Sequence, residues 1–285
     1  MSCSMKGRLI NIGDVELNVF TEGSGQPILV PTGCGTEYYR QTFSEKLQDQ
    51  FQLVYIEMRG TGYSTGSALG ATFASLADDI NAVREALGIQ QAVLMGHSNH
   101  GSIVLEYALN HPKHTAAVIS VASTPDFIRI FPLGGTAWET RATDTQKTIQ
   151  AKLQADFDAL DLQKLDADET ALQGFMTLTP LAWMDPTTDV KHIFGGTPKG
   201  IADYLEVEDH AQKHWHFVPH LSKISAPVLV LSGQHDFFCP TKIWQEAIGQ
   251  LPHGELEIFE NSAHNPQYEE SEKFDAAVTL FLSTL

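Results

Sequence analysis

Two serines of this sequence stand in surroundings that are typical of a catalytic nucleophile. Ser64 lies in the segment GYSTG, a literal match to the pattern G-x-S-x-G, and Ser98 lies in the segment GHSNHG. Such a nucleophile needs a strand that runs directly into it and a helix that begins directly after it, because this sharp turn presents the hydroxyl at the edge of a sheet. Ser98 meets the requirement, between an apolar run at 92–95 and a helical pattern from Gly101, whereas loop residues flank Ser64 on both sides. We therefore predict Ser98 as the nucleophile; an ordinary helix N-cap is the alternative role.

A serine hydroxyl needs a base, and the base needs a carboxylate that orients it. Asp236 follows a predicted strand at 228–231, and His264 follows a predicted strand at 256–259, so both fall in loops at the carboxyl ends of strands. The order Ser, Asp, His along the chain is one that serine hydrolases use. We expect His264 to take the serine proton and Asp236 to fix the tautomer of the imidazole. Asp126, which follows an earlier predicted strand, is the alternative acid.

The other polar clusters favour structural interpretations. His210 and His214 have the i, i+4 spacing that can hold zinc on one helix face, but no glutamate follows His210 and no third ligand is evident in the sequence. We therefore predict no metal and no cofactor. Cys34 has no base beside it in the sequence, which favours a small residue in a tight loop over a reactive thiol. His97 should point away from Ser98, because the turn between them is sharp.

Composition and charge limit the class of protein. The chain has 285 residues, 42% of them hydrophobic and 19% charged, which suits one large globular domain or such a domain with an insertion. A formal net charge of -17 argues against nucleic acid or an anionic membrane surface as a partner. Three widely spaced cysteines favour free thiols in a reducing compartment, and the sequence has neither a signal-peptide pattern nor a membrane span, so we predict a cytoplasmic protein. We expect its partner to be a small-molecule substrate. The sequence leaves the oligomeric state open.

The elements that must position these residues follow from hydrophobic patterning. Short apolar runs alternate with amphipathic stretches in the first and last parts of the chain, which predicts an α/β fold with a mostly parallel sheet and helices on both faces. Between these parts, helical periodicity without strands predicts a lid over the carboxyl ends of the strands. We expect the first part of the core at 1–123, the helical lid at 124–220 and the second part of the core at 221–285.

The sequence around these residues resembles the α/β-hydrolase superfamily. The resemblance rests on GHS at Ser98, on GQHD with Pro240 and on His264 with Pro266, Glu269 and Phe274; in addition, MRGTGYS around Ser64 is similar to a structural loop of prolyl-aminopeptidase-like and related members. It implies an eight-stranded, mostly parallel sheet with an inserted helical lid and a triad of Ser98, His264 and Asp236. It also implies an oxyanion hole made by the backbone N–H groups of Asn99 and Cys34.

Two positions depart from the pattern of this superfamily. His100 stands where a glycine usually lets strand and helix pack tightly, and Gly101 follows it at once. Thr32 stands where the oxyanion loop usually has histidine. Both oxyanion donors are main-chain groups, so the expected oxyanion hole is compatible with Thr32.

The expected reaction is acyl transfer to Ser98, followed by attack of water on the acyl-enzyme. We expect an ester of small to medium size and apolar character, with Trp183, Trp215 and Glu206 as substrate-binding residues of the lid. The first alternative is a prolyl-aminopeptidase-like activity on small peptides with a free N-terminus, because lid carboxylates hold the substrate amine in such members; Glu206 and Glu208 are the candidates. The second alternative is a binding protein or a lyase with the same fold.

Overall fold

One sheet of eight strands organises the computed structural model, which describes residues 6–33 and 35–285. The strands are β1 (Arg8–Asn11), β2 (Glu16–Glu22), β3 (Gln26–Thr32), β4 (Phe51–Glu57), β5 (Ala92–His97), β6 (Thr115–Val121), β7 (Val228–Gly233) and β8 (Gly254–Phe259). Their order across the sheet is β1-β2-β4-β3-β5-β6-β7-β8. Strand β2 pairs antiparallel with β1 and with β4, and all other neighbours pair in parallel. The predicted mostly parallel, eight-stranded sheet is confirmed.

The central strands are apolar without interruption because both of their faces are covered. Every residue of β5 and β7 is buried, and β6 is buried except at Ala116. Strand β1 was missed by sequence reasoning, because it is only four residues long and only Ile10 of these is buried. It forms an edge hairpin with β2, so pairing rather than burial defines it.

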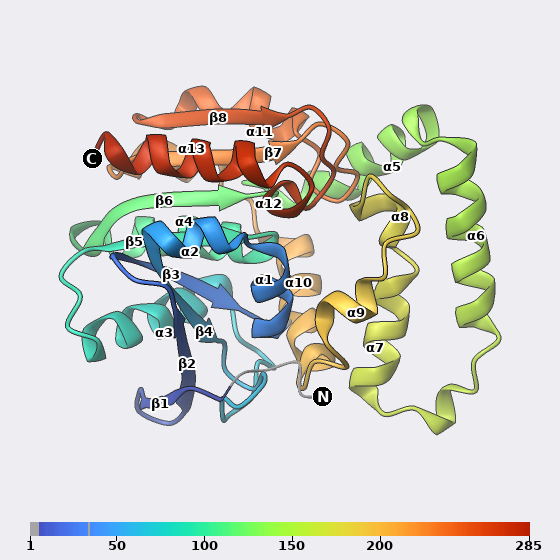
Figure 1. Cartoon of the computed structure of the whole chain (residues 1–285), viewed down its shortest axis with the longest axis horizontal. Helices are drawn as coiled ribbons and strands as arrows, with labels where there is room; N and C mark the ends of the chain where they lie inside the picture. Colours follow the sequence, from blue (N-terminus) through green and yellow to red (C-terminus); the bar gives the residue numbers. More distant parts are fainter. Residues whose placement is uncertain (1–5, 34) are drawn as a thin grey trace.

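Two sets of helices cover the two faces of the sheet (Figure 1). One face packs against α1 (Thr36–Thr42), α2 (Glu45–Gln50) and α13 (Ser271–Ser283). The other face packs against α3 (Phe73–Ala86), α4 (Asn99–Asn110) and α11 (Lys242–Ala247). The short helix α12 (Pro266–Glu269) leads into α13. None of the helices in the described part of the chain has the length and apolar character needed to span a bilayer.

A helical insertion separates β6 from β7 and lies beyond the carboxyl ends of the central strands (Figure 1). Its helices are α5 (Ile130–Arg141), α6 (Asp144–Asp158), α7 (Ala167–Met176), α8 (Thr179–Ala182), α9 (Val190–Phe194) and α10 (Ile201–His214). Helix α6 buries none of its residues, and it forms an outer arm together with α7. The chain enters and leaves the insertion side by side: Phe127 N–H donates to the carbonyl of Trp215 at 3.3 Å, and Phe217 N–H donates to the carbonyl of Pro125 at 2.8 Å.

Candidate active site

Ser98 occupies a strained turn between β5 and α4. Its backbone has φ of 59° and ψ of -130°, a conformation that residues other than glycine rarely adopt. The Ser98 N–H donates to the carbonyl of Val121 at 2.9 Å, and the Gly101 N–H donates to the carbonyl of Ser98 at 2.9 Å. Sheet and helix therefore hold the turn from both sides, with the serine at the N-terminus of α4.

Gly101 performs the tight packing that the family pattern assigns to the position of His100. A Cβ atom at Gly101 would lie 2.5 Å from the Cβ of Ser123 and 2.9 Å from the carbonyl oxygen of Gly96. No side chain fits at this distance, so α4 approaches the end of β6 through a glycine one position later than usual. The departure at His100 leaves the geometry of the turn intact.

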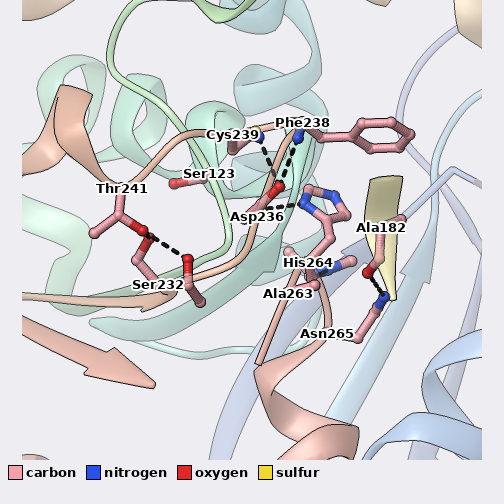
Figure 2. A network of polar contacts seen from close by, with 12 residues as sticks. Ser123, Ala182, Ser232, Asp236, Phe238, Cys239, Thr241, Ala263, His264 and Asn265 are labelled. Carbon is pink, nitrogen blue, oxygen red and sulfur yellow. Dashed lines mark hydrogen bonds and ion pairs between the residues drawn. The ribbon is translucent and has the colours of Figure 1, made fainter. Parts of the chain in front are cut away.

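Asp236 and His264 meet in the loops that follow β7 and β8, and both side chains are buried. Asp236 Oδ2 accepts a hydrogen bond from His264 Nδ1 at 2.7 Å. Asp236 Oδ1 accepts the backbone N–H groups of Phe238 at 2.7 Å and Cys239 at 2.8 Å, which fixes the orientation of the carboxylate (Figure 2). A proton on Nδ1 leaves Nε2 of His264 as the nitrogen that can accept another proton.

Ser98 and His264 line the same cavity, which has a volume of about 570 Å³ and lies between the sheet and the insertion. Most of the lining is apolar and comes from insertion residues and from the loop after β7: Ile130, Phe131, Trp138, Phe175, Leu178, Leu181, Phe194, Leu205, Phe237 and Phe238. Among the described residues, the Ser98 hydroxyl forms no hydrogen bond, including none with His264. Catalytic hydrogen bonds of this kind often form only when substrate is bound.

The expected oxyanion donors can be placed only in part. Asn99 is the first residue of α4, and the first N–H groups of a helix have no partner within the helix. Asn99 is buried and lines the cavity next to Ser98. Cys34, the second expected donor, lies outside the described residues. Thr32 is buried at the end of β3, where its hydroxyl donates to the carbonyl of Ile56 at 3.3 Å.

His97 and His100 are buried supports of the site. His97 Nε2 donates to the carbonyl of His264 at 2.7 Å, so His97 holds in place the loop that carries His264. His100 Nε2 lies 2.9 Å from the hydroxyl of Tyr204, and His100 Nδ1 lies 3.1 Å from the hydroxyl of Tyr39. Burial lowers the pKa of His100 to about 3 and the pKa of His97 well below its ordinary value. Both rings are therefore neutral near pH 7.

The insertion is joined directly to the histidine loop. His264 N–H donates to the carbonyl of Ala182 at 3.0 Å, just at the end of α8. Glu269 accepts the N–H of Met184 at 2.6 Å and the N–H of Ala263 at 2.7 Å, so one carboxylate bridges the insertion and the residue before His264. Burial is the main cause that raises the pKa of Glu269 to about 7. The sequence pointed to Glu269 only as part of the family pattern and assigned it no role.

Ser64 has the structural role that the sequence predicted for it. Its hydroxyl donates to the carbonyl of Glu57 at 2.7 Å and accepts the N–H of Asn18 at 2.9 Å. The side chain is buried, and its two hydrogen bonds tie the loop after β4 to the end of β4 and to β2. A hydroxyl engaged in this way is not available as a nucleophile.

Three residues expected to bind substrate do not line the cavity. Trp183 is buried with its ring against Tyr268. The indole N–H of Trp215 donates to Glu106 at 3.0 Å, and the ring packs on Phe127. Glu206 is exposed on the outer side of α10.

Glu208, two positions after Glu206, lines the cavity instead. Burial raises its pKa, while the nearby His264 lowers it. No hydrogen-bond partner for the Glu208 carboxylate is found in the described part of the chain. The sequence named both carboxylates as candidates, and of the two only Glu208 lies on the face of α10 that lines the cavity.

Asp126 does not pair with His264. Its Oδ2 lies 2.9 Å from Nδ1 of His216, and the two residues form an isolated bridge where the chain enters and leaves the insertion. The rings of His210 and His214 contact each other at the surface of α10, with centroids 4.6 Å apart and the ring planes tilted by 46°. These contacts favour structural roles for all four residues.

Comparisons with known proteins agree with this architecture. A family model described as alpha/beta hydrolase fold matches residues 27–271. The chain is 26% identical over 272 residues to the AB hydrolase superfamily protein YclE of Bacillus subtilis (strain 168), covering 92% of this chain and 93% of that protein. Among solved structures, it is similar to an esterase (EaEST) from Exiguobacterium antarcticum, with a TM-score of 0.67, 20% identity and coverage of 97% of this chain and 99% of that one. It is also similar to proline iminopeptidase of Mycobacterium smegmatis, with a TM-score of 0.70, 20% identity and coverage of 98% of each chain. Because this family model matches most of the chain, residues 27–271, the chain belongs to the alpha/beta hydrolase family of enzymes.

Proposed function

We propose that the chain is a serine hydrolase that cleaves an ester of small to medium size with an apolar acyl group. The observation that carries this proposal is the junction of Ser98, in its strained turn, with the Asp236–His264 pair at one mostly apolar cavity. An apolar wall favours an acyl chain, because burial of each methylene contributes about 0.8 kcal/mol. Membership in the family supports the reaction class, and the substrate class rests on the cavity.

In the proposed mechanism, Ser98 Oγ attacks the acyl carbon while His264 Nε2 takes its proton. Asp236 holds the proton on Nδ1 and stabilises the imidazolium that forms. The N–H of Asn99 and the N–H of Cys34 are the proposed oxyanion donors, and each such donor contributes about 3 kcal/mol to the transition state. His264 then protonates the leaving alcohol, and water attacks the acyl-enzyme by the reverse route.

Labelling with a fluorophosphonate tests the nucleophile. We expect Ser98→Ala to abolish labelling and to reduce turnover roughly a million-fold, as loss of a triad nucleophile does. Ser64→Ala is the matched control, and we expect it to label at the wild-type site while it unfolds at lower urea concentration. The assignment of Ser98 is wrong if labelling survives in Ser98→Ala and disappears in a folded Ser64→Ala.

A second candidate function, removal of an N-terminal residue from small peptides, is favoured by Glu208. Burial in the apolar cavity raises the pKa of Glu208, and a substrate ammonium group beside the carboxylate would stabilise its ionised form. A panel of nitrophenyl esters and aminoacyl anilides separates the two activities. For an esterase, Glu208→Gln keeps ester turnover; for an aminopeptidase, anilides are the better substrates and Glu208→Gln raises their KM.

Failure of both substrate classes, with wild-type protein folded and Ser98 unlabelled, would favour the non-hydrolytic alternative. The cytoplasmic location, the absence of a nucleic-acid partner and the boundaries of the lid at 124–220 stay predictions.

A further inference from the structure

Cys239 is a buried cysteine that the proposed reaction does not use, although it lies beside the catalytic pair. It follows Asp236 by three residues, and its N–H donates to Asp236 Oδ1, so the loop after β7 folds the cysteine back onto the carboxylate. Possible ligand atoms of Asp236, Cys239 and His264 all lie within 4.8 Å of one another, and all three residues are buried. Figure 2 shows the three residues converging from the loops after β7 and β8.

We propose that Asp236, Cys239 and His264 form a binding site for a thiophilic divalent cation such as Zn²⁺ or Cd²⁺, and that occupancy of this site switches the enzyme off. A thiolate, an imidazole and a carboxylate are the ligands that zinc takes in proteins, at separations that a cluster of this size provides. Cations such as Mg²⁺ prefer sites made of oxygen ligands only, so we expect them to bind this set of ligands weakly.

The site is open to the cavity on one side. Cys239 and His264 line the cavity, so a cation can reach them by the path that the substrate takes. Three protein ligands leave a fourth tetrahedral position, which water can fill from the cavity. Glu208 lines the same cavity and brings a further carboxylate to this side.

The charge around Cys239 favours a cation. The Asp236 carboxylate and the Cys239 sulfur have ligand atoms within 4.8 Å of each other, and Glu208 lines the same cavity. These negative charges attract a divalent cation, and binding through the thiolate releases the thiol proton to solvent. The formal net charge of -17 adds a long-range attraction of the same sign.

Occupancy must stop catalysis whichever nitrogen of His264 binds the cation. Coordination through Nδ1 replaces the hydrogen bond to Asp236 Oδ2. Coordination through Nε2 occupies the lone pair that would accept the proton of Ser98. In both cases His264 no longer acts as a base.

Equilibrium binding of Cd²⁺ to chelator-treated protein tests the site without any need for turnover. We expect one tight site in the wild type, seen by calorimetry and by the ultraviolet charge-transfer absorption of a cadmium–thiolate bond. In Cys239→Ser and Cys239→Ala, the absorption should disappear and the affinity should fall roughly 10- to 100-fold or more, because a direct ligand is lost. Cys239→Ala introduces no buried hydroxyl, so it shows the effect even if the serine variant folds poorly. Cys3→Ser is the matched control and should keep both signals.

Inhibition provides the second measurement. Each variant is assayed relative to its own rate without metal, with Zn²⁺, Cd²⁺ and Mg²⁺ separately. We expect Zn²⁺ and Cd²⁺ to inhibit the wild type reversibly, Mg²⁺ to have no effect, and the half-inhibitory concentration to rise at least tenfold in both Cys239 variants. Unchanged binding in the Cys239 variants, or loss of binding in Cys3→Ser, overturns the proposal.

Discussion

Glu269 offers a prediction whose sign and size both follow from the structure. Its carboxylate accepts N–H groups from Met184 and Ala263, yet burial raises its pKa from an ordinary 4.5 to about 7. Since one pKa unit corresponds to about 1.36 kcal/mol, a difference of about 2.5 corresponds to about 3 kcal/mol. Because the side chain is only partly buried, screening by solvent makes this an upper value.

An acidic group whose pKa is raised on folding stabilises the folded state at low pH relative to high pH. The contribution of Glu269 is therefore fully present below about pH 4.5 and is lost as the pH rises through about 7. Glu269→Gln removes this titration, since the amide stays neutral. We expect the free energy of unfolding of wild type, relative to Glu269→Gln, to fall by up to about 3 kcal/mol between pH 4.5 and pH 8.

Urea unfolding at a series of pH values measures this difference directly. Glu270→Gln is the matched control, because Glu270 accepts the N–H of Asn261 and the hydroxyl of Ser262 in the same loop. The pH-dependent loss of stability should disappear in Glu269→Gln and persist in the control, which keeps Glu269. A wild-type advantage over Glu269→Gln that stays constant with pH, or grows as the pH rises, would show that the reasoning about burial is wrong.

Three further predictions concern the Ser98 turn and the Asp236–His264 pair. Asp236→Asn should lower kcat roughly ten-thousand-fold in ester hydrolysis with little change in KM, because the amide no longer fixes the Nδ1 tautomer of its partner. Ser98→Gly should unfold at higher urea concentration than Ser98→Ala, by about 1 kcal/mol, because glycine tolerates a φ of 59°; equal stability would contradict the proposed strain. Gly101→Ala should lower the free energy of unfolding by about 1–3 kcal/mol, since its Cβ would lie 2.5 Å from Ser123; a urea midpoint like that of wild type would argue against tight packing.

The sheet and the three elements that carry Ser98, Asp236 and His264 could be predicted because local patterns encode them. Continuous apolar runs mark strands buried on both faces, and a polar residue directly after such a run lies at the carboxyl edge. Context rather than motif selected Ser98 over Ser64, and the hydrogen bonds of Ser64 agree with that choice. The pairing of Asp236 with His264 follows from the adjacency of β7 and β8.

The residues that line the cavity could be predicted only in part, because they depend on the phase of helices in the insertion. Glu206 and Glu208 lie two positions apart on α10, which turns them by about 200° around the helix axis. One faces outward and the other lines the cavity. Trp183 and Trp215 are apolar enough for a cavity wall or for a core; Trp183 is buried and Trp215 is partly buried against Phe127, so that neither lines the cavity. Only three-dimensional packing decides between these outcomes.

The bonds between the end of α8 and the histidine loop divide the insertion into two parts with different freedom to vary. The segment from Ala182 to Met184 supports His264 through main-chain and carboxylate contacts, so an altered backbone there would displace the His264 loop. Among the described residues, the outer arm of α6 and α7 makes no such bonds with that loop, yet α7 supplies Phe175 to the cavity wall. Substitutions in the arm can therefore reshape the cavity while the segment that holds His264 stays in place.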